Sequence, residues 1–384
     1  MEIAILGNGT VSKGVQKIVA QQNELNNKYV FVRSGKEQEV ANGTSDYQDI
    51  LNDSSVEVVV EALGGIDPAY QMIIEALKAK KNVVTANKAV VARYLKEFQE
   101  IANENQVHFY FESSVGGGIP WIKNLERVLR IDKVSQLSGI FNGTSNFILD
   151  KMYQSNASFS SVLKEAQDLG YAEADPSADI DGYDIENKLC ISADLTYNTF
   201  LKPGDNLIKF GIRSIEAKDI QYFKKHDWKI KLIGQLIKKD HQISFLIEPT
   251  LYDQSSVMAS IDGNNNYIEL TGETIGKLGF MGQGAGMLPT SHAVVQDILD
   301  IYLSDSHLLR DFKDSNDLKD DVIFGDYLIR TKLDLSDFNL SEEITKDGNY
   351  WIFKDVNAKQ IHNLVNKLKN QDENIFMARI NGGE

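Results

Sequence analysis

Short apolar segments alternate with helix-length amphipathic segments along the N-terminal third of the chain, and this alternation constrains the fold more than any other feature of the sequence. The segment "EIAIL" is typical of a strand, Gly7 and Gly9 of a turn, and apolar residues then recur at helical spacing. Strands that are apolar on both faces and alternate with helices indicate a parallel sheet with helices on both sides. We therefore predict a doubly wound α/β domain. Further strands are predicted at 29–32, 56–63, 82–86 and 107–111, with helices at 67–80 and 90–105.

The first turn of such a domain binds the pyrophosphate of a dinucleotide, because glycines allow close approach and the helix N-terminus offers free N–H groups. Gly7 and Gly9 match the first two glycines of G-x-G-x-x-G, whereas Ser12 occupies the third position. A G-x-G pair alone is weak evidence, since a tight turn in any α/β protein can carry it. The surrounding strand and helix pattern favours dinucleotide binding by Gly7, Asn8, Gly9, Thr10 and Val11.

Basic residues follow two of the predicted strands. Arg33 and Lys36 come after the second strand, where an NAD site usually offers an acidic residue to the ribose 2′-hydroxyl. These cations favour NADP, whose 2′-phosphate carries negative charge; the alternative is a solvated strand end. Lys88 follows the fourth strand, at the sheet edge where α/β folds bind ligands. A lysine at a helix start opposes the helix dipole, so this placement favours a functional role.

Two further segments pair a turn with a helix start. "FESSVGGGIP" (111–120) contains three consecutive glycines and Glu112, a set of oxygen donors suited to sodium or potassium, although composition alone favours a plain glycine loop. "FNGTSNF" (141–147) begins an amphipathic helix that Thr144 or Ser145 caps. The N–H groups at the same helix start could instead receive a substrate carboxylate.

The segment "GYAEADPSADIDGYDIENK" (170–188) holds six carboxylates and ends at Lys188. An EF-hand alignment would put this lysine at the twelfth position, which requires a bidentate glutamate, so calcium binding is excluded. The residues after Gly182 predict a helix on which Asp184 and Lys188 share a face at i and i+4. Most such pairs are exposed ion pairs. Here the acidic loop before the helix can fold back over that face, which favours a site. For Asp175, Asp181 and Glu186 we expect a helix cap or solvated surface.

Composition and charge narrow the class of ligand. A net charge of −15 and a pI near 4.9 argue against nucleic acid or an anionic membrane as a partner. The N-terminus does not resemble a signal peptide and no run approaches 18 apolar residues, so we expect a cytoplasmic protein. The single cysteine, Cys190, excludes an internal disulfide, and six scattered histidines do not predict zinc. A small-molecule substrate is therefore expected.

The chain as a whole resembles homoserine dehydrogenases over about residues 1 to 308. The segment from Ala166 to Lys188 matches the long signature of that family throughout. Supporting matches are "GNGTVSKGV", "VEALGG", "TANK", "ESSVGGGIP", "FNGTSNF" and "GQGAGMLPTSHAV". Ser12 departs from the family pattern, which has glycine there, and this puts helix packing or cofactor affinity in doubt.

The resemblance implies NAD(P)H-dependent reduction of L-aspartate 4-semialdehyde to L-homoserine, or the reverse, in threonine, methionine and isoleucine biosynthesis. It also implies a Rossmann-type nucleotide domain and a homodimer or higher homo-oligomer. By position, Lys188 is implied as the proton donor, with Lys88 and Asp184 also at the catalytic centre. Asp184 would raise the pKa of Lys188 and burial would lower it. The implied substrate contacts are Lys88, Gly143, Thr144, Tyr171, Glu173, Asp179 and Asp184; the cation site is Glu112, Val115, Gly117 and Ile119; Thr85, Lys88 and Gly284 contact the cofactor.

We predict domains at 1–130, completed by 284–308, at 131–283 for catalysis and dimerisation, and at 309–384 for a linker and a small tail. Charged residues at 309–321 are typical of a linker. The remainder predicts strand, strand, helix and strand, and it resembles a shortened ACT module. Threonine regulation is one hypothesis for the tail, and a packing or oligomerisation role is the other.

Two other functions were weighed. A non-catalytic dinucleotide sensor has no need of two lysines and an acidic loop, so Lys88, Glu173, Asp184 and Lys188 argue against it. An acylating aldehyde dehydrogenase needs a nucleophilic thiol. Cys190, the only cysteine, follows Lys188 by two residues on a part of the predicted helix that faces inward.

Overall fold

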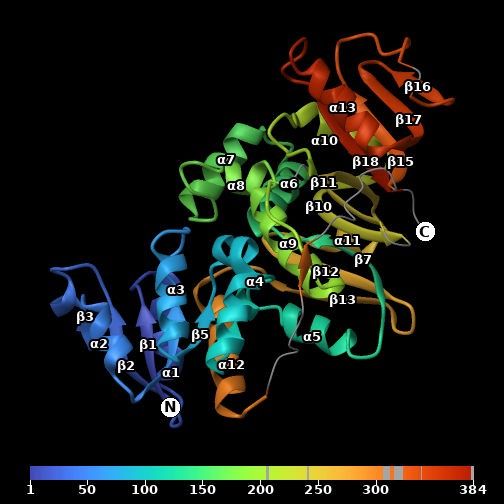
Figure 1. Cartoon of the computed structure of the whole chain (residues 1–384). Helices are drawn as coiled ribbons and strands as arrows, with labels where there is room; N and C mark the ends of the chain where they lie inside the picture. Colours follow the sequence, from blue (N-terminus) through green and yellow to red (C-terminus); the bar gives the residue numbers. More distant parts are fainter. Residues whose placement is uncertain (205–206, 240–241, 306–311, 315–322, 339, 382–384) are drawn as a thin grey trace. The chain divides into compact units, whose positions relative to one another are not determined.

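The chain forms two compact units, each described here by itself. The structure is a computed structural model that describes residues 1–384 except 205–206, 240–241, 306–311, 315–322, 339 and 382–384 (Figure 1). The first unit comprises 1–131, 190–203 and 282–314; the second comprises 132–189, 204–281 and 315–384. Within the described residues, no helix is both long enough and apolar enough to cross a membrane.

The first unit contains the predicted parallel sheet. Its order is β3-β2-β1-β4-β5-β6, and each neighbouring pair is parallel, which is the doubly wound Rossmann order. The predicted α/β class is therefore confirmed. The strands are β1 (Glu2–Leu6), β2 (Asn26–Phe31), β3 (Gly43–Thr44), β4 (Val56–Glu61), β5 (Asn82–Thr85) and β6 (Phe109–Tyr110).

Helices α1 and α12 pack together on this sheet although they are far apart in the sequence. Val15 of α1 and Ile298 of α12 lie in one buried cluster with residues of the central strands, and the Ser291 hydroxyl of α12 donates to the Val11 carbonyl (2.8 Å). The late segment of the chain thus completes the nucleotide-type unit. The elements are α1 (Thr10–Val19), η1 (Glu37–Glu39), α2 (Tyr47–Asn52), α3 (Ala69–Lys78), α4 (Lys88–Asn105), η2 (Glu112–Ser114), α5 (Trp121–Val128) and α12 (Met287–Tyr302), with the parallel pair β8 (Thr199–Phe200) and β14 (Lys313–Asp314).

The second unit is built on one large mixed sheet (Figure 1). Its order is β13-β12-β7-β10-β11-β18-β15-β17-β16, and β9 also pairs with β11. Its centre is antiparallel, and β18 joins β11 in parallel. The strands are β7 (Val134–Ile140), β9 (Ile208–Lys209), β10 (Trp228–Lys239), β11 (Gln242–Asp253), β12 (Asn265–Gly272), β13 (Gly276–Gln283), β15 (Phe324–Arg330), β16 (Ile344–Asp347), β17 (Tyr350–Asn357) and β18 (Phe376–Asn381).

The C-terminal tail therefore shares a sheet with the preceding strands. The predicted strands and helix of the tail are present, and β16 is an additional strand that the sequence did not suggest. The predicted linker at 309–321 lies outside the described residues except for 312–314, which include β14. The pairing of β18 with β11 joins the tail to the rest of the unit through backbone hydrogen bonds.

Helix α9 lies directly against β10 in the second unit. A Cβ on Gly234 of β10 would come within 2.5 Å of Ile185 and 2.6 Å of Leu189, so only glycine allows this approach. Lys188 lies between Ile185 and Leu189 in the sequence of α9, so this close contact fixes the distance of Lys188 from the sheet. The helices are α6 (Gly143–Ser155), α7 (Phe159–Asp168), α8 (Ser177–Ile180), α10 (Ala217–Lys225), α11 (Val257–Ser260) and α13 (Ala358–Leu368), and α9 (Tyr183–Tyr197) begins in this unit and ends in the first.

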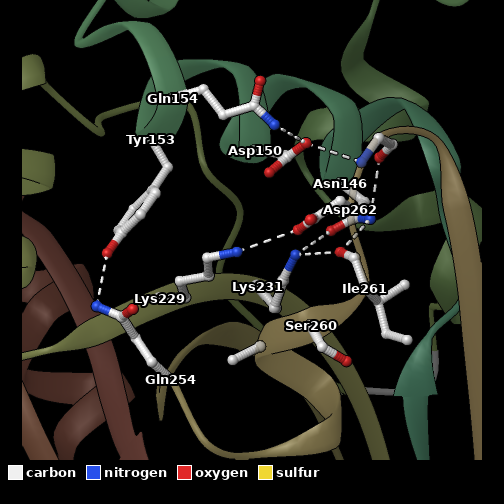
Figure 2. Close-up of polar contacts among 12 residues, drawn as sticks. Asn146, Asp150, Tyr153, Gln154, Lys229, Lys231, Gln254, Ser260, Ile261 and Asp262 are labelled. Atoms are coloured by element: carbon white, nitrogen blue, oxygen red, sulfur yellow. Dashed lines mark hydrogen bonds and ion pairs between the residues drawn. The ribbon is translucent and has the colours of Figure 1, made fainter.

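A buried lysine connects β10, α6 and the loop before β12 (Figure 2). Lys231 is 1% exposed, and its ammonium donates to Asn146 Oδ1 (3.0 Å) and to the Ile261 carbonyl. Asn146 Nδ2 in turn donates to the carbonyls of Ile261 (3.1 Å), Gly263 (3.0 Å) and Asn265 (3.1 Å). One lysine and one amide therefore hold a whole loop against α6.

Burial lowers the pKa of Lys231 to about 8, because the charged ammonium has lost most of its hydration. Asp150 and Asp262 oppose this shift, and Lys229, which pairs with Asp262 at 3.1 Å, adds to it. Figure 2 shows these charged groups around the lysine. The pKa of Lys231 is therefore lower in the fold than in the unfolded chain, where it keeps its ordinary value near 10.5.

We expect Lys231 to make the free energy of unfolding rise with pH between about 8 and 10.5, because this lysine is protonated in the unfolded chain and mostly deprotonated in the fold across that window. The contribution of Lys231 has a limiting slope of about 1.4 kcal/mol per pH unit. Lys231→Met should remove that part of the rise in urea unfolding measured at pH 7 to 10.5. Lys229→Met is the matched control: it removes a smaller contribution to the shift than burial makes, so it should keep most of the rise. Equal slopes for wild type and Lys231→Met would contradict the prediction.

Candidate active site

The carboxyl ends of β1, β4 and β5 bring together the turn residues of the first unit. Gly7 has φ +101°, and Gly9 precedes α1, with no atom within 4 Å of the place where its Cβ would lie. An open turn before a helix of ten residues offers N–H groups to an anion. Asn8 accepts from Gln16 Nε2 (3.3 Å). The geometry of the turn suits a phosphate group.

Ser12 is fully buried in α1, and its hydroxyl has no hydrogen-bond partner among the described residues. The unit therefore accommodates a small polar side chain where the family pattern has glycine. The cost is one unsatisfied buried hydroxyl.

A buried glutamate that the sequence analysis missed organises the end of β5. Glu61 is fully buried and accepts from the Thr85 hydroxyl, and burial raises its pKa. The N–H of Asn87 donates to the same hydroxyl (3.0 Å), while Asn87 caps α4 and donates to the Gly65 carbonyl (2.6 Å). These contacts place Lys88 as the first residue of α4, at the edge of the sheet.

The two cations after β2 differ in their surroundings. Arg33 and Lys36 are both exposed, but the Lys36 ammonium pairs with Glu39. Arg33 is therefore the better placed of the two to meet a phosphate.

The glycine loop lies against the segment that begins α12. Gly117 has φ +59°, and a Cβ there would come within 2.4 Å of the Gly284 backbone. Both carboxylate oxygens of Glu112 accept from the start of α5, from Ile122 N–H (2.9 Å) and Lys123 N–H (2.7 Å). Burial raises the pKa of Glu112 to about 8. The loop is thus held at both ends.

A cavity of about 240 Å³ adjoins Glu112, Gly118 and Lys123, and Asp297 of α12 also lines it. Asp297 accepts from the Glu112 N–H (2.9 Å), and burial raises its pKa, with the Glu112 charge adding to the effect. No group of three or more histidine, cysteine or acidic side chains among the described residues could hold a metal.

In the second unit, Lys188 and Asp184 form a buried ion pair. Their side chains are 7% and 4% exposed, and Lys188 Nζ lies 2.8 Å from Asp184 Oδ2. The ammonium also donates to the Phe141 carbonyl (2.6 Å), which accepts a second bond from Asn266 Nδ2 (2.8 Å). An exposed i,i+4 pair, the usual alternative, is excluded.

Asn142 joins this pair to the acidic loop, and the sequence analysis missed it. Its Nδ2 donates to Asp184 Oδ2 (2.8 Å) and to Asp179 Oδ1 (2.7 Å). Its Oδ1 accepts from the Ser145 N–H (2.7 Å), so Asn142 caps α6. The expectation that Thr144 or Ser145 is the cap was wrong. An asparagine before a helix was a visible signal, because Asn is a preferred cap.

Apart from Lys88, which belongs to the first unit, the other residues implied as substrate contacts lie at the start of α6 or on the acidic loop. The Thr144 hydroxyl donates to the Tyr171 carbonyl (2.7 Å), and the Tyr171 ring contacts Phe147 edge to face. Gly143 is the first residue of α6. Glu173 is exposed, and its side chain makes no hydrogen bond or ion pair with the described residues. The structure thus gathers Gly143, Thr144, Tyr171, Asp179, Asp184 and Lys188, and leaves Glu173 facing solvent.

The remaining carboxylates of the acidic segment have structural partners. Asp175 accepts from the N–H of Ser177 at the start of α8 (3.1 Å), and Asp181 pairs with Arg213 (2.6 Å). Glu186 was expected to be a cap or solvated surface, and this is wrong: it is 3% exposed, pairs with Lys209 (2.6 Å) and accepts from the Gly204 N–H.

The two clusters support distinct chemistry. The turn of the first unit suits a dinucleotide. The second cluster holds a lysine ammonium beside carboxylates, and such a group can stabilise and protonate an alkoxide that forms when hydride reaches an aldehyde.

Comparisons with known proteins agree with this chemistry. Residues 7–112 match the NAD-binding domain model of homoserine dehydrogenase, and residues 120–299 match the homoserine dehydrogenase model. The homoserine dehydrogenase of Synechocystis sp. is 39% identical over 78% of this chain and 73% of its own length.

Solved structures give the same result. A homoserine dehydrogenase from Thiobacillus denitrificans aligns with a TM-score of 0.88 and 29% identity over 99% of this chain and 98% of its own. A hyperthermophilic archaeal homoserine dehydrogenase in complex with NADPH aligns with a TM-score of 0.69 and 26% identity over 80% of this chain and 99% of its own. The chain belongs to the homoserine dehydrogenase family.

Proposed function

We propose that Lys188 protonates the carbonyl oxygen when this NAD(P)-dependent homoserine dehydrogenase reduces L-aspartate 4-semialdehyde to L-homoserine. The observation that carries this assignment is the buried Lys188 ammonium between Asp184 Oδ2 (2.8 Å) and the Phe141 carbonyl (2.6 Å). A bound nicotinamide supplies the hydride to the aldehyde carbon. The proton leaves Nζ for the new alkoxide oxygen, and Lys188 recovers a proton from solvent.

The neighbouring residues would bind and orient the amino-acid substrate. Asp179, with Glu173 on the same loop, offers negative charge to the substrate ammonium. Gly143 and Thr144 begin α6, a helix of 13 residues whose N-terminus suits the substrate carboxylate. The Tyr171 carbonyl accepts a hydrogen bond from the Thr144 hydroxyl, which holds the acidic loop beside the start of α6. Lys88 would be a second lysine close to the nicotinamide and the substrate. A non-catalytic sensor is not supported, because the relatives are enzymes.

Lys188→Ala should lower kcat by at least about 10³-fold, since it removes both the proton and the charge that stabilises the alkoxide. Lys188→Arg retains a cation but does not release a proton near neutral pH, and it should lose at least about 10²-fold. Steady-state oxidation of NADPH with the semialdehyde measures both values. NADPH binding, followed by fluorescence, is the control and should stay near normal. A Lys188→Ala variant with most of its kcat would rule out the role of this lysine.

NADPH is the proposed preferred cofactor, with NADH as the alternative. Arg33 is the exposed cation after β2 that has no acidic partner among the described residues, and the archaeal relative was solved with NADPH. The turn residues Gly7 to Val11, together with Thr85 and Gly284, would contact the rest of the dinucleotide. The match to the NAD-binding domain model supports a nicotinamide dinucleotide, and the preference for NADPH over NADH is the proposal made here.

Arg33→Ala should raise the KM for NADPH about tenfold, which corresponds to about 1.4 kcal/mol for one lost charge-assisted contact. The KM for NADH should not change, because NADH has no 2′-phosphate. Lys36→Ala is the matched control and should have a smaller effect, since Lys36 already pairs with Glu39. An equal change for both cofactors would show that Arg33 does not read the 2′-phosphate.

A sodium or potassium ion is proposed at the glycine loop. The carboxylate of Glu112 and the backbone of Val115, Gly117 and Ile119 would hold it, and it would rigidify the loop that lies against Gly284. The glycine turn with φ +82° at Gly116 and +59° at Gly117 supports a site made largely of carbonyl oxygens.

Replacing sodium and potassium by tetramethylammonium at equal ionic strength should lower the Tm, because a bound ion stabilises only the fold. At ten times its Kd the ion contributes about 1.4 kcal/mol. Glu112→Gln should lose most of this difference when the Tm is measured in the same three salts. Identical wild-type Tm values in all salts would argue against the site.

Three further properties belong to the same proposal. A homodimer, or a higher homo-oligomer, is proposed for the assembly, and a hollow of about 500 Å³ on the sheet face around Ile233, Thr250 and Tyr267 is a candidate contact surface. A cytoplasmic location is part of the proposal, since reduced nicotinamides are available there. An ACT-like role of the tail, with threonine as effector, remains a hypothesis beside a packing role.

A further inference from the structure

Helix α8 carries Asp179 but has only four residues, so it cannot be stable on its own. Arg213 contacts the residues at both of its ends. Its Nε and Nη2 donate to the two oxygens of Asp181 (3.1 and 2.6 Å), and Nη2 also donates to the Ser177 hydroxyl (3.1 Å). Asp179 lies between these two contacts in the sequence, so one guanidinium spans the segment that presents it.

The backbone around Arg213 lies against the same helix. The N–H of Ile212 donates to the carbonyl of Ile180 (2.8 Å), and Ile180 is the last residue of α8. The side chain of Arg213 therefore extends from a backbone that already touches the helix it holds.

The segment from Lys209 to Asp219, which we name the strap, is anchored on its other side by the tail. Arg330 of β15 is 3% exposed, and its Nε donates to Asp219 Oδ1 (2.9 Å) while its Nη2 donates to the Ser214 carbonyl (2.6 Å). The Ser214 hydroxyl donates to the Ile375 carbonyl (2.9 Å). Lys209 pairs with the buried Glu186 at the strap's start (2.6 Å). The strap is thus fixed independently of α8.

The grip of Arg213 itself is at the surface. Its side chain is 57% exposed and that of Asp181 is 28% exposed. Exposed ion pairs usually contribute little to global stability, although bidentate Arg–carboxylate geometry strengthens them. A change at Arg213 should therefore free α8 without unfolding the protein. Asn142 also contacts Asp179, from the turn before α6.

We propose that Arg213 is a positioning residue that fixes α8 on the tail-anchored strap and so sets how well Asp179 meets the substrate. This inference rests on the proposed role of Asp179 in substrate binding. It also assigns a use to the tail: through Arg330 it supplies the fixed base from which Arg213 acts.

Arg213→Ala should raise the KM for L-aspartate 4-semialdehyde roughly tenfold, because a small displacement of a binding group is enough for such a loss. The Kd for NADPH should be unchanged, and the Tm should fall by less than about 3 °C. Arg213→Lys can reach Asp181 but lacks the planar fork that also spans to Ser177, so its KM should fall between the two. The matched control is Lys354→Ala, which breaks an exposed 2.6 Å pair with Asp326 in the tail and should leave KM unchanged.

The double variant separates positioning from a general structural effect. If Arg213 acts through Asp179, then Arg213→Ala should add little to the KM of Asp179→Asn. The inference would be overturned if the two substitutions multiplied their effects on KM in the double variant. It would also be overturned if the KM of Arg213→Ala were within twofold of that of the Lys354→Ala control. A silent Asp179→Asn would instead remove the proposed substrate role of Asp179 itself, and with it the path through which Arg213 is argued to act.

Discussion

The buried ion pair of Lys188 and Asp184 is the interaction on which the candidate active site depends. Removing two charges from water costs several kcal/mol per ion, and the pair is tolerated only when further hydrogen bonds satisfy it. Asn142 provides one to Asp184, and the Phe141 carbonyl accepts one from Lys188. These partners come from the turn before α6, so α6 and α9 must meet for the pair to be buried at all.

Other buried charges in the second unit follow the same rule. Glu248 of β11 accepts from Tyr327 (3.1 Å) and lies 2.7 Å from His362 Nε2, both in the tail. Arg330 meets Asp219, and Lys231 meets Asn146 and a carbonyl. Such contacts break at a high cost, because each leaves an unpaired group in the interior. The tail is therefore joined to the rest of this unit by polar contacts as well as by the β11–β18 pairing.

Local patterns predicted the elements well where the signal was periodic. The alternation of apolar strands and helices predicted the parallel sheet, and the i,i+4 spacing put Asp184 and Lys188 on one face. Predictions about which polar group meets which were weaker. The link that Asn142 makes to Asp184 was missed, and Glu186 was expected at the surface, because the partners of these two side chains lie 42 and 23 positions away in the sequence. Glu61 was missed for the same reason, since its partner Thr85 comes from the next strand of the sheet.

The sequence by itself determined the α/β class, the glycine turn and the family signature, because these depend on residue types at fixed local spacing. Only the tertiary structure decided which carboxylates are buried and what holds them. Asp179 is bound to Asn142 and Asp181 to Arg213, although the two aspartates are the same residue type two positions apart in the sequence. The physical reason is that desolvation and hydrogen-bond geometry are properties of neighbours in space, and these neighbours come from turns, helices and strands far apart along the chain.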